Sequence, residues 1–350
     1  MKLCLDSVVE SYLCSLGEEM YMDRYTFHGI TIDLATNSLM ILQDIRADYN
    51  YFRTAMSKVQ PDIRLYAFMR GAKKKSLISV SDGAVLFSRS LGFDIYRFGE
   101  FYFVKSKVSD AVGVLDNTGN LFVGIGTETS AFCELLHNIF EACLISRLER
   151  KGIHRLHASA VAKDESFGIL FPASMLGGKT TAFLCCLKTG LAYLTDDTCL
   201  IQRNGSKLKA LAFPTRVGVD QDFVQRFSDL QFLLEGEPFT YSTGIRKWFL
   251  DVKEAFTNSI LDTCEPRLLI FPRLWWSEKS KIEKISKGDA MQESTRIFLE
   301  PNFLRLAPSS SSTRAEKFEL SSLLVDSTDC YKLYIGRKPE ILTETLAELF

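Results

Sequence analysis

The segment 167–201 constrains the fold of this chain more than any other part of the sequence. Phe167–Phe171 is a short apolar run that ends at a proline, which is typical of a β-strand. A turn containing Gly177-Gly178 follows, and apolar residues then recur at helical spacing over 180–188. Leu191–Thr195 is a second strand-like run. The order strand, turn, helix, strand predicts an α/β unit.

The turn has the residue types of a phosphate-binding loop. Residues 173–180 read ASMLGGKT and match the end of the pattern G-x-x-x-x-G-K-[ST], with Ala173 in place of the first glycine. Gly177-Gly178 lets backbone N–H groups approach phosphate oxygens, Lys179 can reach the β- and γ-phosphates of ATP, and Thr180 can offer its hydroxyl to Mg²⁺. An ordinary strand-turn-helix is the alternative. We favour a Mg²⁺–ATP site with contacts from Ala173, Ser174, Gly177, Gly178, Lys179, Thr180 and Thr181.

Paired carboxylates follow the second strand. Asp196 and Asp197 stand directly after Leu191–Thr195. Crowded carboxylates cost free energy unless a metal or a partner offsets it. One carboxylate can hold Mg²⁺ and the other can take the proton of an attacking hydroxyl, so both are predicted to be catalytic. Thr180 and Asp197 are the expected metal ligands. The alternative is a simple turn, because Asp-Asp-Thr is turn-prone.

Composition limits the class of protein and its partners. The 350 residues carry a formal net charge of −1, which favours neither nucleic acid nor a membrane surface as a partner. The nine cysteines include no CxxC pair, and we expect reduced thiols in a cytoplasmic protein. The N-terminus lacks the apolar core of a signal peptide, and no apolar run of about 18 residues predicts a transmembrane helix.

Residues 1–126 predict a β-rich domain. Short apolar runs are separated by turn residues, and Asp116–Asn120 predicts a hairpin turn. No catalytic constellation is visible here, so substrate recognition or assembly is assigned to this domain by elimination. The expected strands are Ile30–Leu34, Ser38–Leu42, Leu77–Val80, Val85–Phe87, Phe101–Val104, Ala111–Leu115 and Leu121–Ile125, with a short helix over Arg46–Lys58.

The second expected domain, 127–350, begins with a helix. Apolar residues recur over 132–148 at steps of three and four, and Gly152 is placed to end the helix. A strand that starts at His157 then leads to the phosphate loop.

The motifs of this domain resemble a known family. Leu156–Val161, the string ILFPASMLGGKTT, Tyr193–Thr198 and Ala212–Pro214 are similar to the catalytic domain of HPr kinase/phosphorylase. The resemblance covers about 130–220 and no motif extends it to the β-rich half. It implies a fold similar to phosphoenolpyruvate carboxykinase with a mixed sheet, so the expected fold class is α+β or α/β.

The resemblance also implies roles for individual residues. His157 corresponds to the family histidine near the acidic pair and the γ-phosphate, and Asp196 or Asp197 corresponds to the base that acts on a serine hydroxyl. The family loop is usually G-x-x-G-x-G-K-[ST], whereas this chain has Ala173 and Leu176 at the first two glycine positions. A leucine hinders backbone conformations of positive φ.

The expected activity is an ATP-dependent kinase that phosphorylates a hydroxyl, most plausibly a serine of a small protein or peptide. A catalytically weak nucleotide sensor or scaffold and a small-molecule kinase are the alternatives. Arg216, Arg246 and Lys247 are basic candidates for contacts with phosphate or substrate, and a surface salt bridge is the alternative for each. Self-association into a homo-oligomer is left open.

Overall fold

A computed structural model gives the fold of the chain and describes residues 9–10, 19–71, 78, 83–89, 92–241, 243–256, 260–300 and 311–349. The chain divides into two compact units. The first contains the residues up to Leu148 and the segment Thr240–Ile245, and the second contains Glu149–Phe239, Arg246–Glu300 and the described residues from 311 on. The boundary expected after residue 126 precedes a long helix, and the units divide near the end of that helix. The strand expected at Leu77–Val80 falls, apart from residue 78, outside the described ranges.

A mixed sheet of nine strands forms the first unit. The strands are β1 (Tyr21–Phe27), β2 (Ile30–Thr36), β3 (Arg53–Thr54), β4 (Ile63–Met69), β5 (Val85–Arg89), β6 (Phe93–Phe98), β7 (Phe101–Ser106), β8 (Val112–Asp116) and β9 (Leu121–Gly126). Their order is β3-β1-β2-β4-β9-β8-β7-β6-β5. β4 is parallel to both of its neighbours, and the hairpin expected around Asp116–Asn120 is present as the antiparallel pair β8 and β9.

Helix α2 (Leu39–Tyr49) corrects two of the expectations for this unit. The hydroxyl of Ser38 accepts a hydrogen bond from the N–H of Ile41 and begins the helix, and the buried side chains of α2 follow the helical spacing. The strand expected at Ser38–Leu42 is therefore wrong. The helix expected over Arg46–Lys58 is present only in its first residues, because α2 begins at Leu39 and helical structure ends at Phe52. A single 3₁₀ turn, η1 (Asn50–Phe52), follows α2.

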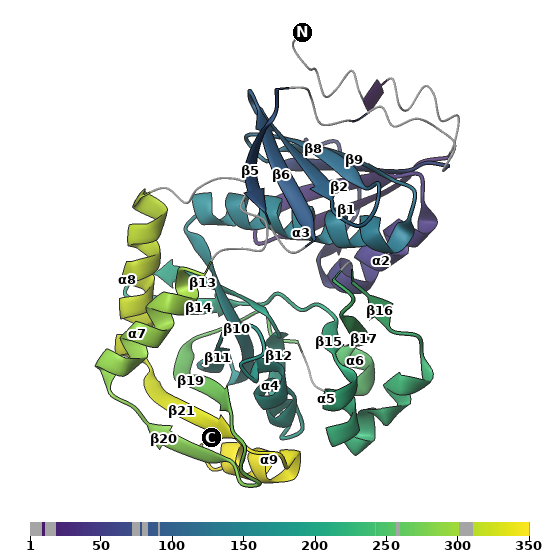
Figure 1. Ribbon diagram of the computed structural model, residues 1–350. Coiled ribbons are helices and arrows are strands. Elements are labelled where there is room, and N and C mark those ends of the chain that lie inside the picture. The colour runs from purple at the N-terminus through teal and green to yellow at the C-terminus, as the bar shows by residue number, and fades with distance from the viewer. Residues whose placement is uncertain are drawn as a thin grey trace. The chain divides into compact units, whose positions relative to one another are not determined.

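Helix α3 (Thr129–Arg150) is the long helix that the sequence predicts, and Gly152 follows it at a φ of 73°. Tyr49 of α2 stacks on Phe140 of α3 with ring centroids 4.5 Å apart, and Phe140 also meets the ring of Tyr25 on β1. Figure 1 shows both helices against the same sheet. The buried aromatic side chains therefore hold the two helices to each other and to β1.

A second mixed sheet forms the centre of the second unit. Its strands are β10 (Ile153–Asp164), β11 (Phe167–Pro172), β12 (Ala192–Thr195), β13 (Thr198–Asn204), β14 (Lys207–Leu211), β18 (Thr263–Cys264), β19 (Pro266–Leu274), β20 (Lys281–Lys284) and β21 (Asp329–Ile335). The order is β18-β14-β13-β10-β11-β19-β21-β20, and β12 also pairs with β10. β11, β19 and β21 are parallel neighbours.

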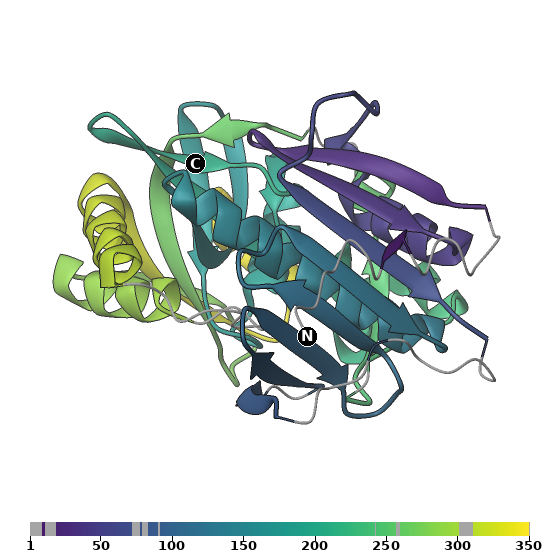
Figure 2. The same ribbon diagram turned by 90° about the horizontal axis from the view of Figure 1, so that it is seen from above.

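Helices cover both faces of this sheet. α4 (Lys179–Leu187) and α9 (Pro339–Ala347) pack in one hydrophobic cluster, and α7 (Lys287–Phe298) and α8 (Ser311–Ser327) pack in another. Figures 1 and 2 both show α7 and α8 side by side. The predicted α+β or α/β class with large mixed sheets is therefore confirmed.

A small three-stranded sheet, β15-β17-β16, packs on the cluster that contains α4. The sheet consists of β15 (Val217–Val219), β16 (Phe239–Thr240) and β17 (Arg246–Leu250). The same stretch of chain contains α5 (Gln221–Arg226), η2 (Ser228–Glu235) and α6 (Val252–Ala255).

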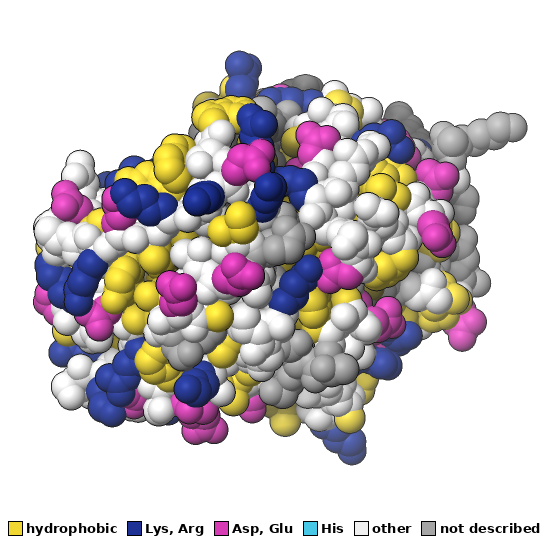
Figure 3. All heavy atoms as spheres, turned by 90° about the horizontal axis from the view of Figure 1, so that it is seen from below, with side chains coloured by type: hydrophobic (Ala, Val, Ile, Leu, Met, Phe, Trp, Pro, Cys, Tyr) yellow, Lys and Arg dark blue, Asp and Glu magenta, His cyan; other side chains and the backbone are white. Residues whose placement is uncertain are grey.

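The surface carries charges of both signs. On the face seen in Figure 3, basic and acidic side chains are interspersed with hydrophobic ones. Within the ranges that the structure describes, no helix is both long and apolar enough to cross a membrane.

Candidate active site

The centre of the candidate site lies on one face of β10. Arg155, His157 and Ser159 alternate along this strand, and alternate residues of a strand share a face. β12 and β13 both pair antiparallel with β10, and Asp196 and Asp197 interrupt the chain between them. This break in the pairing brings both carboxylates to the side chains of β10.

The predicted phosphate loop joins β11 to α4. The N–H of Ala173 donates to the carbonyl of His157 at 3.2 Å, and the N–H of Gly177 donates to the carbonyl of Ser174 at 3.1 Å. A Cβ atom on Gly177 would lie 2.7 Å from the Cβ of Ala173, so the alanine fits only because residue 177 has no side chain. Leu176 is 81% exposed and adopts a φ of 61°, the left-handed conformation that a leucine hinders. The loop therefore forms a tight turn although Ala173 and Leu176 stand where the pattern G-x-x-G-x-G-K-[ST] has glycine.

Lys179 places its ammonium group among three acceptors. Its side chain is buried, and Nζ donates to the carbonyl of Ala173 at 3.0 Å. The same nitrogen lies 2.7 Å from Nε2 of His157 and 3.4 Å from Oδ1 of Asp197. The lysine therefore links the loop to the histidine and to the acidic pair.

His157 lies between two carboxylates. Nδ1 is 2.8 Å from Oε2 of Glu300, and Nε2 is 2.9 Å from Oδ1 of Asp197. A neutral imidazole that donates from Nδ1 to Glu300 leaves Nε2 as an acceptor for Lys179, whereas donation from Nε2 to Asp197 excludes that contact. The ammonium and the Asp197 carboxylate therefore compete for the same ring nitrogen.

Asp196 is the buried member of the acidic pair. Its side chain accepts from the hydroxyl of Ser159 at 3.2 Å and from the hydroxyl of Thr180 at 3.3 Å, and its backbone carbonyl accepts from Ser159 as well. Burial and the charge of Asp197 raise the pKa of Asp196 to about 6. The charge of the Asp196 carboxylate is therefore not fully compensated by its neighbours, which makes this residue a candidate ligand for a cation.

Asp197 is the accessible member, with 58% of its side chain exposed. Desolvation opposes its ionisation, but the hydrogen bond from His157 and the charges of Lys179 and Arg155 outweigh it and hold the pKa of Asp197 well below its usual range. The side chain of Arg155 lies 3.4 Å from Oδ2 of Asp197 and donates to Thr198 at 3.2 Å. Asp197 is therefore ionised at neutral pH, and a molecule from solvent can reach its carboxylate.

The fit of a Mg²⁺ ion depends on oxygen ligands beside the loop. Thr180 and Asp196 supply a hydroxyl and a carboxylate that already lie 3.3 Å apart. The sequence predicts Thr180 and Asp197 as the metal ligands. In the part of the chain that the structure describes, no three histidine, cysteine or acidic side chains are grouped as a metal site. Mg²⁺ usually takes only one or two carboxylates and completes its shell with water and phosphate, so Thr180 and Asp196 fit this ion.

Three contributors to this site were not anticipated: Arg155, Glu300 and Arg296. The alternation along β10 could have identified Arg155, because it shares the face of His157. Nη1 of Arg296 on α7 donates to Oγ of Ser174 at 2.8 Å across 122 residues of sequence. Glu300 follows the same helix and is 143 residues from His157. No local pattern reveals such distant contacts.

The remaining predicted residues lie apart from these contacts. Thr181 is buried on α4. The guanidinium of Arg216 lies 4.4 Å from the ring centroid of Phe249, and that of Arg246 lies 5.8 Å from the ring of Trp248. Both aromatic residues belong to the small sheet. The role of these basic residues in substrate binding stays a prediction.

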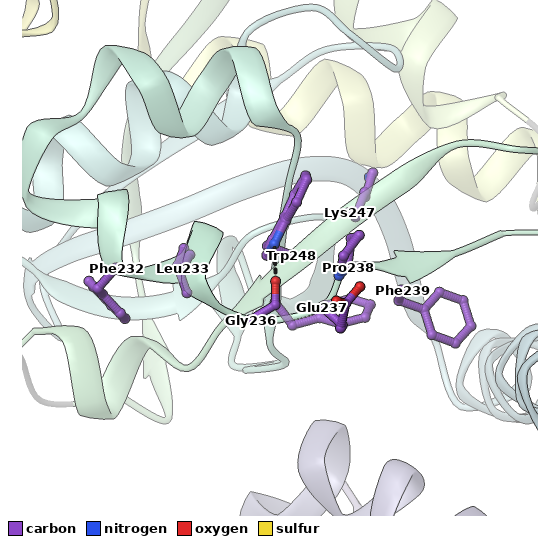
Figure 4. A pocket seen from close by; sticks show the side chains of 9 residues that line it. Phe232, Leu233, Gly236, Glu237, Pro238, Phe239, Lys247 and Trp248 are labelled. Carbon is purple, nitrogen blue, oxygen red and sulfur yellow. Dashed lines mark hydrogen bonds between the residues drawn. The ribbon is translucent and has the colours of Figure 1, made fainter.

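Lys247, the third basic candidate, lines a separate open cleft of about 530 Å³. Apolar side chains such as Phe232, Leu233 and Phe249 form much of its wall. Figure 4 shows the indole N–H of Trp248 donating to the carbonyl of Gly236, at 2.9 Å. The cleft is thus a feature of the small sheet, built from η2 and β17.

Comparison with known proteins gives little further information. No protein-family profile matches the chain, and no curated protein matches it. Among solved structures, the HPr(Ser) kinase/phosphatase from Coxiella burnetii is similar at 13% identity and a TM-score of 0.27, over 56% of this chain and 95% of that one. A likeness this low carries no argument about fold or activity, so the case for a function rests on the residues themselves.

Proposed function

We propose that the second unit is an ATP-dependent kinase that transfers the γ-phosphate to a hydroxyl, that of a serine in a small protein or peptide. One observation carries the proposal: the loop residues Lys179 and Thr180 meet Asp196, Asp197 and His157 within hydrogen-bonding or ion-pairing distance. Folding alone gives no reason to gather an ammonium, two carboxylates and an imidazole beside a glycine-rich turn. Phosphoryl transfer requires these groups for positioning and charge stabilisation.

In this proposal the loop holds the nucleotide. The backbone N–H group of Gly178 and the start of α4 bind the phosphates, the N–H of Gly177 closes the turn on Ser174, and Lys179 turns from His157 to the β- and γ-phosphates. Departure of the ammonium frees Nε2 of His157, and a ring that carries a proton on both nitrogens can then donate to Glu300 and to Asp197 together. The imidazole then keeps that carboxylate oriented toward the acceptor.

The two carboxylates take different roles. Asp197 accepts the proton of the attacking hydroxyl, which is supported by its exposure and its ionised state. Thr180 and Asp196 hold Mg²⁺, in place of the pair Thr180 and Asp197, because Asp196 is buried beside the Thr180 hydroxyl. The bound ion supplies charge neutralisation at the phosphates.

The cellular setting and the partners are part of the same proposal. The seven cysteines that the structure describes are buried free thiols, which suits a cytoplasmic protein. The β-rich first unit recognises the protein or peptide substrate or mediates assembly, including assembly into a homo-oligomer.

A catalytically weak nucleotide sensor is the second candidate. It is favoured by the left-handed Leu176 and by a Lys179 ammonium already satisfied by protein acceptors, both of which reduce the gain from binding phosphate. A small-molecule kinase would use the same groups with a different acceptor.

Calorimetric titration with Mg²⁺–ATP, followed by mass spectrometry of serine peptides incubated with the protein, tests the proposal. The kinase predicts binding that Lys179→Ala removes and phosphate on a serine. Binding without transfer or hydrolysis supports the sensor. Absence of binding refutes both.

A further inference from the structure

Three parallel strands bring distant segments to one edge of the second sheet. β11, β19 and β21 are neighbours with the same direction. The phosphate loop follows β11, Trp275–Ser280 follows β19, and Gly336-Arg337 follows β21. Segments that follow parallel strands meet outside the carboxyl ends of those strands, where α/β proteins bind ligands.

The contacts of Gly178 place these segments close to the loop. A Cβ atom on Gly178 would lie 2.7 Å from Cδ1 of Ile335 and 3.3 Å from Cδ2 of Leu274, the last residues of β21 and β19. Trp276 and Arg337 each stand two residues beyond these contacts, within about 7 Å of chain. A ligand bound at the loop therefore has both side chains within reach.

Trp276 is an exposed aromatic surface with a cation beside it. Its relative exposure is 88%, which is unusual for the largest side chain in a protein. The guanidinium of Arg337 lies 5.8 Å from its ring centroid, and the N–H of Arg337 donates to the carbonyl of Ser277 at 3.0 Å, which fixes the two segments to each other. The other charges at this place are Lys279 and the ion pair of Glu278 with Lys338.

We propose that Trp276 and Arg337 form a platform on which the base of the bound nucleotide stacks. This inference rests on the proposed function, because it takes the phosphates of the same nucleotide to lie on the loop. A planar base is the ligand that an exposed indole with a neighbouring guanidinium recognises best. The cations beside the ring also suit the charge of the nucleotide.

Stacking alone predicts a particular selectivity. Every base has a π-face, so the platform accepts adenine and guanine with similar affinity and binds the smaller pyrimidines less well. Discrimination between ATP and GTP would require hydrogen bonds to the base edge, which these two side chains do not provide.

The test compares Mg²⁺–ATP with Mg²⁺–tripolyphosphate, which has the phosphates without the base. Calorimetry on the full chain should show that Trp276→Ala weakens ATP binding by about 5- to 150-fold and leaves tripolyphosphate binding within about twofold. Trp276→Phe, which keeps a stacking ring, should recover most of the affinity. Lys179→Ala should weaken both ligands and so reports on the phosphate site alone.

Unchanged ATP affinity in Trp276→Ala, with tripolyphosphate still bound, overturns the platform and leaves the proposed function standing. Equal loss of both ligands in a Trp276→Ala protein with an unchanged unfolding temperature also overturns it, since the ring would then act on the phosphates. If the wild-type chain binds neither ligand, the proposed function fails and the platform fails with it. Protection of Trp276 by a second copy of the chain, seen as concentration-dependent fluorescence without nucleotide, would assign the surface to self-association instead.

Discussion

Substitution of Asp196 by asparagine should make the protein more stable at alkaline pH while it removes a proposed metal ligand. The pKa of Asp196 is raised from 3.8 to about 6, so ionisation is harder in the folded than in the unfolded chain. The folded state loses stability as pH rises through this interval and carries the full cost above it. At about 1.4 kcal/mol per unit, a shift of about two units corresponds to roughly 3 kcal/mol.

The gain in Asp196→Asn should be somewhat smaller than this figure. Asparagine keeps an oxygen for the Ser159 hydroxyl, and its amide can pair with Thr180, so about 1 kcal/mol of hydrogen bonding is at risk. A net gain of about 2 kcal/mol at pH 8 corresponds to an increase of a few degrees in the midpoint of thermal unfolding. Near pH 4 the gain should be lost and the variant should be slightly less stable than the wild type, because Asp196 is then protonated in the folded chain and the loss of hydrogen bonding remains.

Differential scanning calorimetry between pH 4 and pH 8, with and without Mg²⁺–ATP, makes this measurement. The ligand should raise the unfolding temperature of the wild type and have much less effect on Asp196→Asn, because the cation then has no carboxylate to neutralise. Asp197→Asn is the matched control with the opposite sign, since a lowered pKa gives stability that is present at neutral pH and is lost in acid. The reasoning would be refuted if Asp196→Asn were less stable than the wild type at pH 8, or if the difference in stability between the two proteins did not change with pH.

Three further substitutions test the loop and the histidine. Leu176→Gly should relieve the left-handed backbone and raise the free energy of unfolding by roughly 0.5–1 kcal/mol in urea titration, and a loss of stability would contradict the strain. Gly178→Ala places a Cβ 2.7 Å from Ile335 at a φ of 93° and should cost about 1–3 kcal/mol in the same titration; unchanged stability would contradict the close contact. Glu300→Ala should lower kcat about 10- to 100-fold without changing KM for ATP, because His157 loses its partner at Nδ1, and Glu300→Gln should restore much of the rate. Equal kcat in wild type and Glu300→Ala would show that the contact is unimportant.

The sequence predicted those parts of the fold that local patterns determine. The turn before α4, α3, α4, β11 and β12 carry strong periodicity or clear breakers and lie where they were expected, whereas β10 begins at Ile153, four residues before the expected start at His157. The error at Ser38–Leu42 arose because a short apolar run is ambiguous between strand and helix, and the Ser38 cap decides it. The pairing order of the nine strands of each large sheet depends on contacts far apart in sequence, which no local pattern determines.

In the candidate site, too, the sequence predicts what is local and misses contacts between distant parts of the chain. The sequence predicted the residues that are close together in the chain and stand at the ends of predicted elements, namely Lys179, Thr180, Asp196 and Asp197. It could not predict Glu300, because this residue contacts His157 only through the packing of the folded unit. The difference between the two carboxylates also required the structure, since Asp196 is buried and Asp197 is exposed, whereas the sequence treats them alike.

The rate of the chemical step in a single turnover tests the central claim most directly. Excess protein, Mg²⁺–ATP labelled in the γ-phosphate and a serine peptide identified by mass spectrometry should give labelled phosphoserine. Asp197→Asn should bind Mg²⁺–ATP but form product about 10²–10⁴-fold more slowly, because the general base is lost. Transfer at the wild-type rate in Asp197→Asn would contradict the account.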